Sequence, residues 1–195
     1  MSKIFIDKRY FTDHKVKWVS FEDNPRLKET KGDIYSRCVP CITNLYEQLK
    51  QGKEEVRLGP AFSCWKVVVV LESMDECVDL LADLEKRLVD PIKVKGRFGS
   101  VDENKRTKVV VFNAAGESQR DKLYEMLVAC AGRINPSAEV SYHRGCAELY
   151  HELFGDWKVW KAEEAIRKPE AVPAILDRIR KVLFWEKDRG EQENS

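Results

Sequence analysis

The stretch WKVVVVLESMDECVDLL, residues 65–81, decides the fold of this chain. Its first part is rich in β-branched valine, which predicts a strand. The valines are consecutive rather than alternating, so we expect both faces of this strand to be covered. Ser73 and Glu76 have the spacing of a capping box, in which each side chain bonds to the backbone of the other at a helix start. The apolar stripe that follows predicts an amphipathic helix: Cys77, Leu80, Leu81, Leu84 and Leu88.

The segments after this helix predict a hairpin and a second helix. Residues 92–98 alternate between apolar and basic side chains, and residues 107–113 form a second valine-rich segment after a polar turn. Another capping box, starting at Ser118, precedes a helix and then a short strand over residues 139–143. The resulting order β-α-β-β-α-β is the split βαβ pattern of ferredoxin-like domains, with a four-stranded sheet and two helices on one face.

Weaker patterns precede this core. Two short strands are expected at residues 3–11 and 15–21. A helix is expected to start near Pro40, because proline is tolerated at the first helical position. Residues 51–60 are polar and have the composition of a linker.

The part of the chain after the core is predicted to be helical, with helices at residues 147–154, at 156–167 and after Pro173. We therefore expect an α+β fold, a ferredoxin-like core with N-terminal strands and a C-terminal helical extension. The expected parts are residues 1–60, residues 61–145 and residues 146–195, joined in one compact unit.

A thioredoxin-like fold is the alternative. That fold places a Cys-x-x-Cys pair at the head of a helix, after a buried strand, and a proline before a later strand. Cys38 and Cys41 match the first feature, and Pro91 precedes the segment that begins at Ile92. The residues before Cys38 do not form a buried strand, so the ferredoxin-like pattern is favoured.

Composition narrows the class of protein. The 195 residues carry 34 basic and 33 acidic side chains, for a net charge of +1, and 43% of them are hydrophobic. A balanced charge argues against a general polyanion binder, and the hydrophobic share argues against disorder. The longest apolar run, residues 67–71, is far shorter than the roughly 18–20 residues of a membrane helix, so no membrane association is expected.

The first residues and the cysteines bear on the compartment. Residues 1–10 lack the apolar segment and the cleavage site of a secretory signal, so we expect a cytoplasmic protein with reduced thiols. Cys77 and Cys130 fall on the apolar stripes of their predicted helices, and free cysteine behaves as a small hydrophobe. We expect both in the core.

Other cysteines form a candidate zinc site. Cys38 and Cys41 are spaced as Cys-x-x-Cys, and His143 and Cys146 repeat that spacing, so together they would supply a tetrahedral ligand set. A helix N-terminus also favours thiolate, which makes a redox dithiol a second interpretation. The favoured interpretation involves no chemistry: the first pair lies on the apolar face of its helix, and His143 lies at a strand end. We therefore expect no cofactor, and zinc is the one that these residues would suit.

The predicted hairpin is basic on one face, and such a strip can contact the phosphates of RNA or another anionic ligand. The candidate ligand-binding residues are Lys93, Lys95, Arg97, Lys105 and Arg106. The helix over residues 75–90 is acidic by contrast. Opposite patches on one domain fit self-association or a protein partner equally well.

Residues 142–146, Tyr-His-Arg-Gly-Cys, form the densest polar cluster of the chain, at a strand end that leads into a glycine turn. The sequence contains no Gly-rich phosphate loop and no hydrolase motif. We therefore predict a non-catalytic binding or protein-interaction module that takes RNA or an anionic ligand on its basic strand. The alternatives are a zinc-binding or thiol-redox protein and, by analogy of fold alone, an endonuclease that uses His143.

Overall fold

The computed structural model describes residues 19–20, 31–88, 92, 94–97, 108–145 and 147–184. The chain divides into two compact units, and each is described by itself. Unit 1 comprises residues 1–34 and 63–145, and unit 2 comprises residues 35–62 and 146–195. Within the described ranges, every helix is too short or too polar to cross a membrane.

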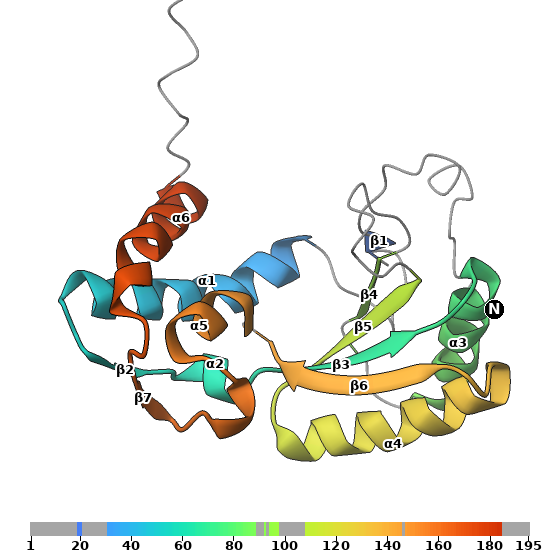
Figure 1. The fold of residues 1–195 in the computed structure, drawn as a ribbon. Coiled ribbons are helices and arrows are strands. Elements are labelled where there is room, and N and C mark those ends of the chain that lie inside the picture. Colours follow the sequence, from blue (N-terminus) through green and yellow to red (C-terminus); the bar gives the residue numbers. More distant parts are fainter. Residues whose placement is uncertain are drawn as a thin grey trace, which may run out of the picture. The chain divides into compact units, whose positions relative to one another are not determined.

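Unit 1 contains an antiparallel sheet, and its described strands follow the order β1-β4-β5-β3-β6 (Figure 1). These strands are β1 (Val19–Ser20), β3 (Trp65–Val70), β4 (Val94–Arg97), β5 (Val109–Ala114) and β6 (Glu139–Arg144). β4 pairs with β5, which confirms the predicted hairpin, and β3 lies between β5 and β6. β1 falls inside the strand predicted at residues 15–21, whereas the strand predicted at residues 3–11 lies outside the described residues.

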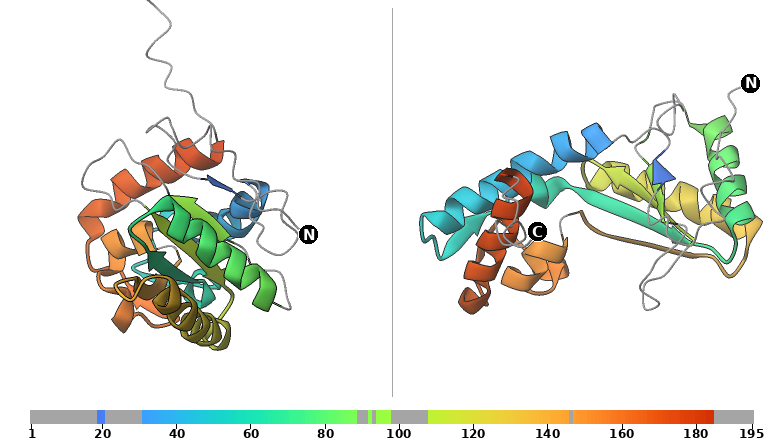
Figure 2. Two further views of the ribbon diagram at one scale, coloured as in Figure 1. Left: turned by 90° about the vertical axis from the view of Figure 1, so that its right-hand side faces the viewer. Right: turned by 90° about the horizontal axis from the view of Figure 1, so that it is seen from above.

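Two helices connect the strands of this sheet, α3 (Met74–Arg87) and α4 (Glu117–Ile134). α4 contacts β3, β5 and β6 on one face of the sheet and also contacts α3 (Figure 2). Cys77 in α3 and Cys130 in α4 are 0% and 1% exposed, which confirms that both lie in the core. The chain order through unit 1 is β3-α3-β4-β5-α4-β6, a mixed α/β arrangement.

The predicted capping box of α3 is confirmed. The Ser73 hydroxyl accepts a hydrogen bond from the Glu76 backbone N–H at 3.2 Å, and the Glu76 carboxylate accepts one from the Ser73 N–H at 3.4 Å. The Asn135 side-chain amide donates to the same carboxylate at 3.3 Å. The start of α3 is therefore tied to the residue that ends α4.

The capping box predicted at Ser118 is wrong. α4 begins at Glu117 and its N-cap is Gly116, two residues before the predicted cap, where no side chain is present to accept a capping hydrogen bond. Gln119 accepts a hydrogen bond from the Ala115 backbone N–H at 2.8 Å. A side chain within the first turn thus satisfies the backbone donor ahead of the helix, and Ser118 is not needed as a cap.

Burial along β3 differs from the prediction made for its valine run. Val67 and Val69 are 0% exposed, whereas Val68 and Val70 are half-buried, so the prediction that both faces are covered is wrong for this strand. β5 is the strand that is buried along its whole length. β5 is the middle strand of the described order, whereas β3 lies next to the edge strand β6.

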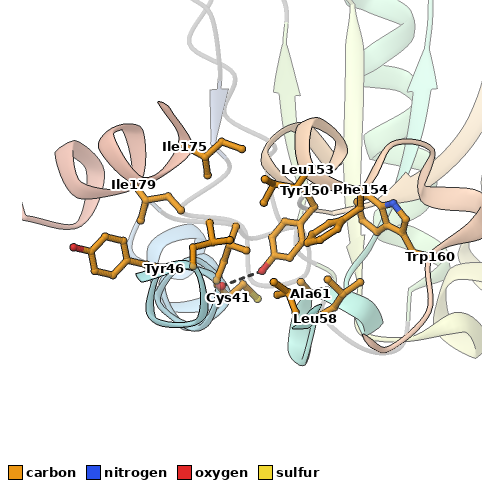
Figure 3. Packing of buried hydrophobic residues seen from close by; sticks show 13 residues of the cluster. Cys41, Tyr46, Leu58, Ala61, Tyr150, Leu153, Phe154, Trp160, Ile175 and Ile179 are labelled. Carbon is orange, nitrogen blue, oxygen red and sulfur yellow. Dashed lines mark hydrogen bonds between the residues drawn. The ribbon is translucent and has the colours of Figure 1, made fainter. Parts of the chain in front are cut away.

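Unit 2 brings together helices from both ends of the sequence. They are α1 (Lys31–Lys50), α2 (Pro60–Ser63), α5 (Ala147–Phe154) and α6 (Val172–Phe184), with 3-10 turns η2 (Trp157–Val159) and η3 (Pro169–Ala171). Their buried side chains form one hydrophobic cluster, which includes Tyr46 of α1, Leu153 of α5 and Ile175 of α6 (Figure 3). Tyr150 lies within it, and its hydroxyl donates a hydrogen bond to the Cys41 carbonyl at 3.0 Å.

The start of α1 corrects the sequence interpretation. The helix begins at Lys31 and contains Pro40, so Cys38 and Cys41 lie inside a helix rather than at its head. The Pro40 side chain is exposed, and on that side water can hydrate the carbonyl that loses its N–H partner. The helix head that the thioredoxin-like alternative requires is therefore missing.

Two further predictions fail in unit 2. The linker predicted at residues 51–60 contains β2 (Glu55–Arg57), and the helix predicted at residues 156–167 contains η2 and β7 (Glu163–Ala165). β2 and β7 pair antiparallel in a separate sheet. On the other side of β2, the Gln48 amide donates to the Arg57 carbonyl and accepts from the Arg57 N–H, both at 2.9 Å.

Candidate functional site

Residues 142–145 of the predicted polar cluster lie at the end of β6, and the strand sends its side chains to opposite faces of the sheet. Tyr142 faces α4, because its ring makes an edge contact with Tyr124 at 5.4 Å between centroids. His143 therefore belongs to the other face, which we call the second face. Cys146 lies outside the described residues.

On the helix-covered face, two arginines stack on a tryptophan. The guanidinium carbons of Arg144 and Arg120 lie 4.0 and 4.1 Å from the centroid of the Trp65 ring. The Glu117 carboxylate is 3.7 Å from Arg120 and 3.8 Å from Arg144. The net shift of the Arg144 pKa is downward, and burial is its main cause. The charge of Arg120 lowers this pKa further, whereas the charge of Glu117 raises it.

This cation–aromatic cluster is a packing feature rather than an open site. The side chains of Arg144 and Arg120 are 7% and 12% exposed, and both face Glu117 and the Trp65 ring. Arg120 also pairs with Asp121 at 2.8 Å and lies over the Tyr142 ring. The contacts join β3 and β6 to the first turns of α4. They fix the end of β6 and so the position of His143 on the second face.

The second face carries a polar row across three strands. Lys66 of β3 pairs with Asn113 of β5 on one side and with His143 of β6 on the other. Directly opposite residues in an antiparallel sheet place their Cβ atoms about 4.5–5.5 Å apart on the same face. Lys66 and His143 are half-buried, whereas Asn113 is 8% exposed.

Hydrogen bonding and burial define the state of His143. Its Nδ1 lies 2.8 Å from the Arg144 carbonyl oxygen. Burial lowers the pKa of His143, the hydrogen bond to Arg144 raises it, and the charge of Lys66 lowers it further; the net shift is downward. The imidazole is therefore neutral at pH 7, since its ordinary pKa is about 6.5.

The accessible part of the second face is narrow. On β5 the side chains of this face, Val109, Val111 and Asn113, are buried. The neighbouring positions on β3 and β6 are half-exposed or exposed. We call these positions the β3–β6 strip: Lys66, Val68, Val70, Glu139, Ser141 and His143.

The predicted basic strand is described in part. Lys95 and Arg97 belong to β4, where they pair with Val111 and Val109. Lys93, Lys105 and Arg106 lie outside the described residues. A ligand role for these five residues stays a prediction.

The predicted zinc ligands are also described in part. Cys38 is half-buried, Cys41 is 3% exposed in the core of unit 2, and His143 belongs to unit 1. Among the described residues, no group of three or more His, Cys, Asp or Glu side chains could hold a metal ion. Because Cys146 is not among them, the zinc site stays a prediction.

Sequence reasoning missed Lys66. It interrupts the apolar strand directly after Trp65, a polar position that the valine run obscures. Its importance comes from the register that sets it opposite His143, which one sequence does not contain. Comparison of the chain with protein-family models, with curated proteins and with solved structures finds no match.

Proposed function

We propose that the chain is a non-catalytic binding module that holds single-stranded RNA against the second face of the unit 1 sheet. The observation that carries this proposal is the Lys66–His143 pair, two half-buried nitrogen side chains opposite each other on β3 and β6. The ammonium of Lys66 supplies the fixed positive charge that phosphates require. Exposed Ser141 in the next row adds a hydroxyl for sugar or phosphate contacts.

The register of β4 places two positions of the basic strand on the second face. Lys95 pairs with Val111 and Arg97 pairs with Val109, and both valines lie on the same face of β5 as Asn113. Since paired positions share a face, these two positions of β4 belong by register to the second face. The buried side chains of Val109, Val111 and Asn113 lie between these positions and the β3–β6 strip, so we propose the basic strand as a separate place of phosphate contact.

For unit 1 we propose a ferredoxin-like fold. The chain order β3-α3-β4-β5-α4-β6 and the antiparallel strand order β4-β5-β3-β6 support it. In that fold the helices occupy one face of the sheet. RNA as the ligand rests on the side chains described above, because a fold alone does not identify a function.

Fluorescence anisotropy with a short labelled single-stranded RNA at low salt tests the proposal. Lys66→Glu is expected to weaken binding about tenfold and to lower the slope of log affinity against log salt by at least about 0.7, the value for one phosphate contact on a single strand. The matched control is Lys122→Glu, the same charge change at an exposed position of α4, which contacts the opposite face. This control is expected to bind like the unmodified protein.

Two results would overturn the proposal. One is the absence of any affinity at low salt, and the other is an equal loss of affinity in Lys66→Glu and Lys122→Glu. The double variant Lys95→Glu, Arg97→Glu extends the test to the basic strand, where an unchanged affinity would remove that strand from the surface. Tighter binding of duplex than of single-stranded RNA would contradict the choice of ligand.

A further inference from the structure

The outer edge of β6 presents backbone groups at alternate residues. The Gly145 N–H donates to the Cys64 carbonyl, so this antiparallel pair is of the hydrogen-bonded type. Pairs of that type alternate with the other type along the ladder, which turns the N–H and carbonyl groups of Val140 and Tyr142 away from β3. β6 is an end strand of the described order, so these groups point out of the sheet. They form a template on which another strand can pair.

Apolar side chains run along the same edge on the helix-covered face. The Tyr142 ring contacts Tyr124 of α4 but stays 37% exposed, and Val128, one helical turn further, is 44% exposed. α4 and β6 run in opposite directions (Figure 1), and a helical turn advances about as far as two residues of a strand. This step brings Val140 beside Val128. We call these four residues the edge strip, and an exposed apolar strip beside an open strand edge marks an interaction site.

The backbone of β6 is complementary to itself. In an antiparallel pair about a two-fold axis at Ser141, Val140 of one copy lies opposite Tyr142 of the other. Both residues turn their backbone groups outward and their side chains toward α4, so this register can form hydrogen bonds and join the two edge strips. An axis at Tyr142 would need the Arg144 carbonyl, whose oxygen already lies 2.8 Å from the neighbouring imidazole nitrogen. An axis at Val140 would pair Tyr142 with a residue before the start of β6.

The register centred on Ser141 is also complementary in charge. Within one copy, Glu139 lies opposite Val70, two rows from Lys66 on the second face. In the two-fold pair, Glu139 of one copy enters the row of Lys66 of the other, two strand spacings or about 10 Å away. Opposite charges attract at this distance, which is close to the screening length at physiological salt. The acidic end of each β6 thus meets the basic row of the other copy.

We propose that β6 docks a second copy of this chain edge to edge, with the two edge strips packed against each other across the axis. The inference goes beyond the proposed RNA binding and does not depend on it. The axis is perpendicular to the sheet, so the second faces of both copies lie on the same side. A strand edge and a short apolar strip make a small interface, so the dimer is reversible and depends on concentration.

Analytical ultracentrifugation of the full chain between about 1 μM and about 1 mM, the range of transient complexes, tests for this dimer. Val128→Glu places a charge in the edge strip and is expected to weaken association at least about tenfold. The matched control is Val159→Glu, at a valine of unit 2 that is 53% exposed, and it is expected to associate like the unmodified protein. Val140→Pro removes an N–H that points away from β3, so it is expected to abolish pairing and leave the sheet intact.

Hydrogen exchange followed by NMR identifies the strand that pairs. The Val140 amide is expected to gain protection as the concentration rises, whereas the Ser141 amide, directed to β3, is protected throughout. A monomer at every concentration overturns the proposal, and so does a dimer that persists in Val128→Glu. Equal weakening by Val128→Glu and Val159→Glu, or exchange at Val140 that does not change with concentration, overturns it as well.

Discussion

Gly145 lies against Cys64 at the end of β6, and the contact leaves no space for a side chain. Its N–H donates to the Cys64 carbonyl at 2.7 Å, and a Cβ atom at this position would lie 2.4 Å from the Cys64 Sγ and 3.3 Å from its Cβ. We therefore expect Gly145→Ala to destabilise the protein by about 1–3 kcal/mol, the usual cost of overpacking. Urea unfolding measures this loss.

Gly132 supplies the matched control for that prediction. It lies in α4 with nothing within 4 Å of an added Cβ, so Gly132→Ala is expected to stabilise the helix by about 0.5–1 kcal/mol. Combining Gly145→Ala with Cys64→Ala removes Sγ and is expected to recover part of the loss. Equal stability of the two glycine variants would contradict the contact.

Cys77 is expected to be inert in the native protein. Burial is the main cause that raises the pKa of this thiol to about 12, and the charge of Glu76 adds to it. Because the thiolate is the reactive form, iodoacetamide at about pH 8 should leave Cys77 unmodified while half-exposed Cys64 reacts. Peptide mass spectrometry after native labelling reads this out, and equal labelling of the two cysteines would refute it.

The capping hydrogen bonds of α3 make a prediction at the scale of the element. Ser73→Ala removes the acceptor for the Glu76 N–H and is expected to lower the free energy of unfolding by about 1 kcal/mol. Ser118→Ala is the comparison, since Ser118 lies inside the first turn of α4 and caps nothing. Thermal or urea unfolding should show no loss for Ser118→Ala, and a loss as large as that of Ser73→Ala would restore the cap predicted there.

The sequence predicts correctly those helices and strands whose own residues carry a clear pattern. β3, α3 and the β4–β5 hairpin combine valine runs, a serine cap and an apolar stripe, and each lies where its pattern indicates. β2 and β7 have no such signal, because each buries a single side chain, Val56 and Glu164. Their pairing depends on residues far apart in the chain, so periodicity within either segment cannot reveal it.

The candidate site shows the same division. The polar cluster around His143 is visible in the sequence, because it ends a strand and leads into a glycine turn. Its partner Lys66 is identified by strand register, which sets Lys66 of β3 directly opposite His143 of the neighbouring strand β6. Register is a property of the folded sheet, and a shift by one residue would send His143 to the face covered by α4.

At the scale of the whole molecule, the two compact units should respond separately to core substitutions. Leu153 is 0% exposed in the cluster of unit 2, so Leu153→Ala is expected to cost about 2–5 kcal/mol. Native-state hydrogen exchange should show the larger loss of amide protection in unit 2. Leu81→Ala, at a fully buried position of unit 1, should reverse the pattern, and uniform loss in both variants would show that the units unfold together.

The amide of Gln48 gives unit 2 a safeguard against aggregation. A strand edge with unsatisfied backbone groups is a template on which strands of other chains can assemble. Beside β2, the Gln48 side chain already holds both the N–H and the carbonyl of Arg57, as a third strand would. An incoming chain would have to displace both hydrogen bonds of Gln48, whose side chain belongs to a residue that is only 7% exposed. This edge is therefore closed to fibril growth at Arg57.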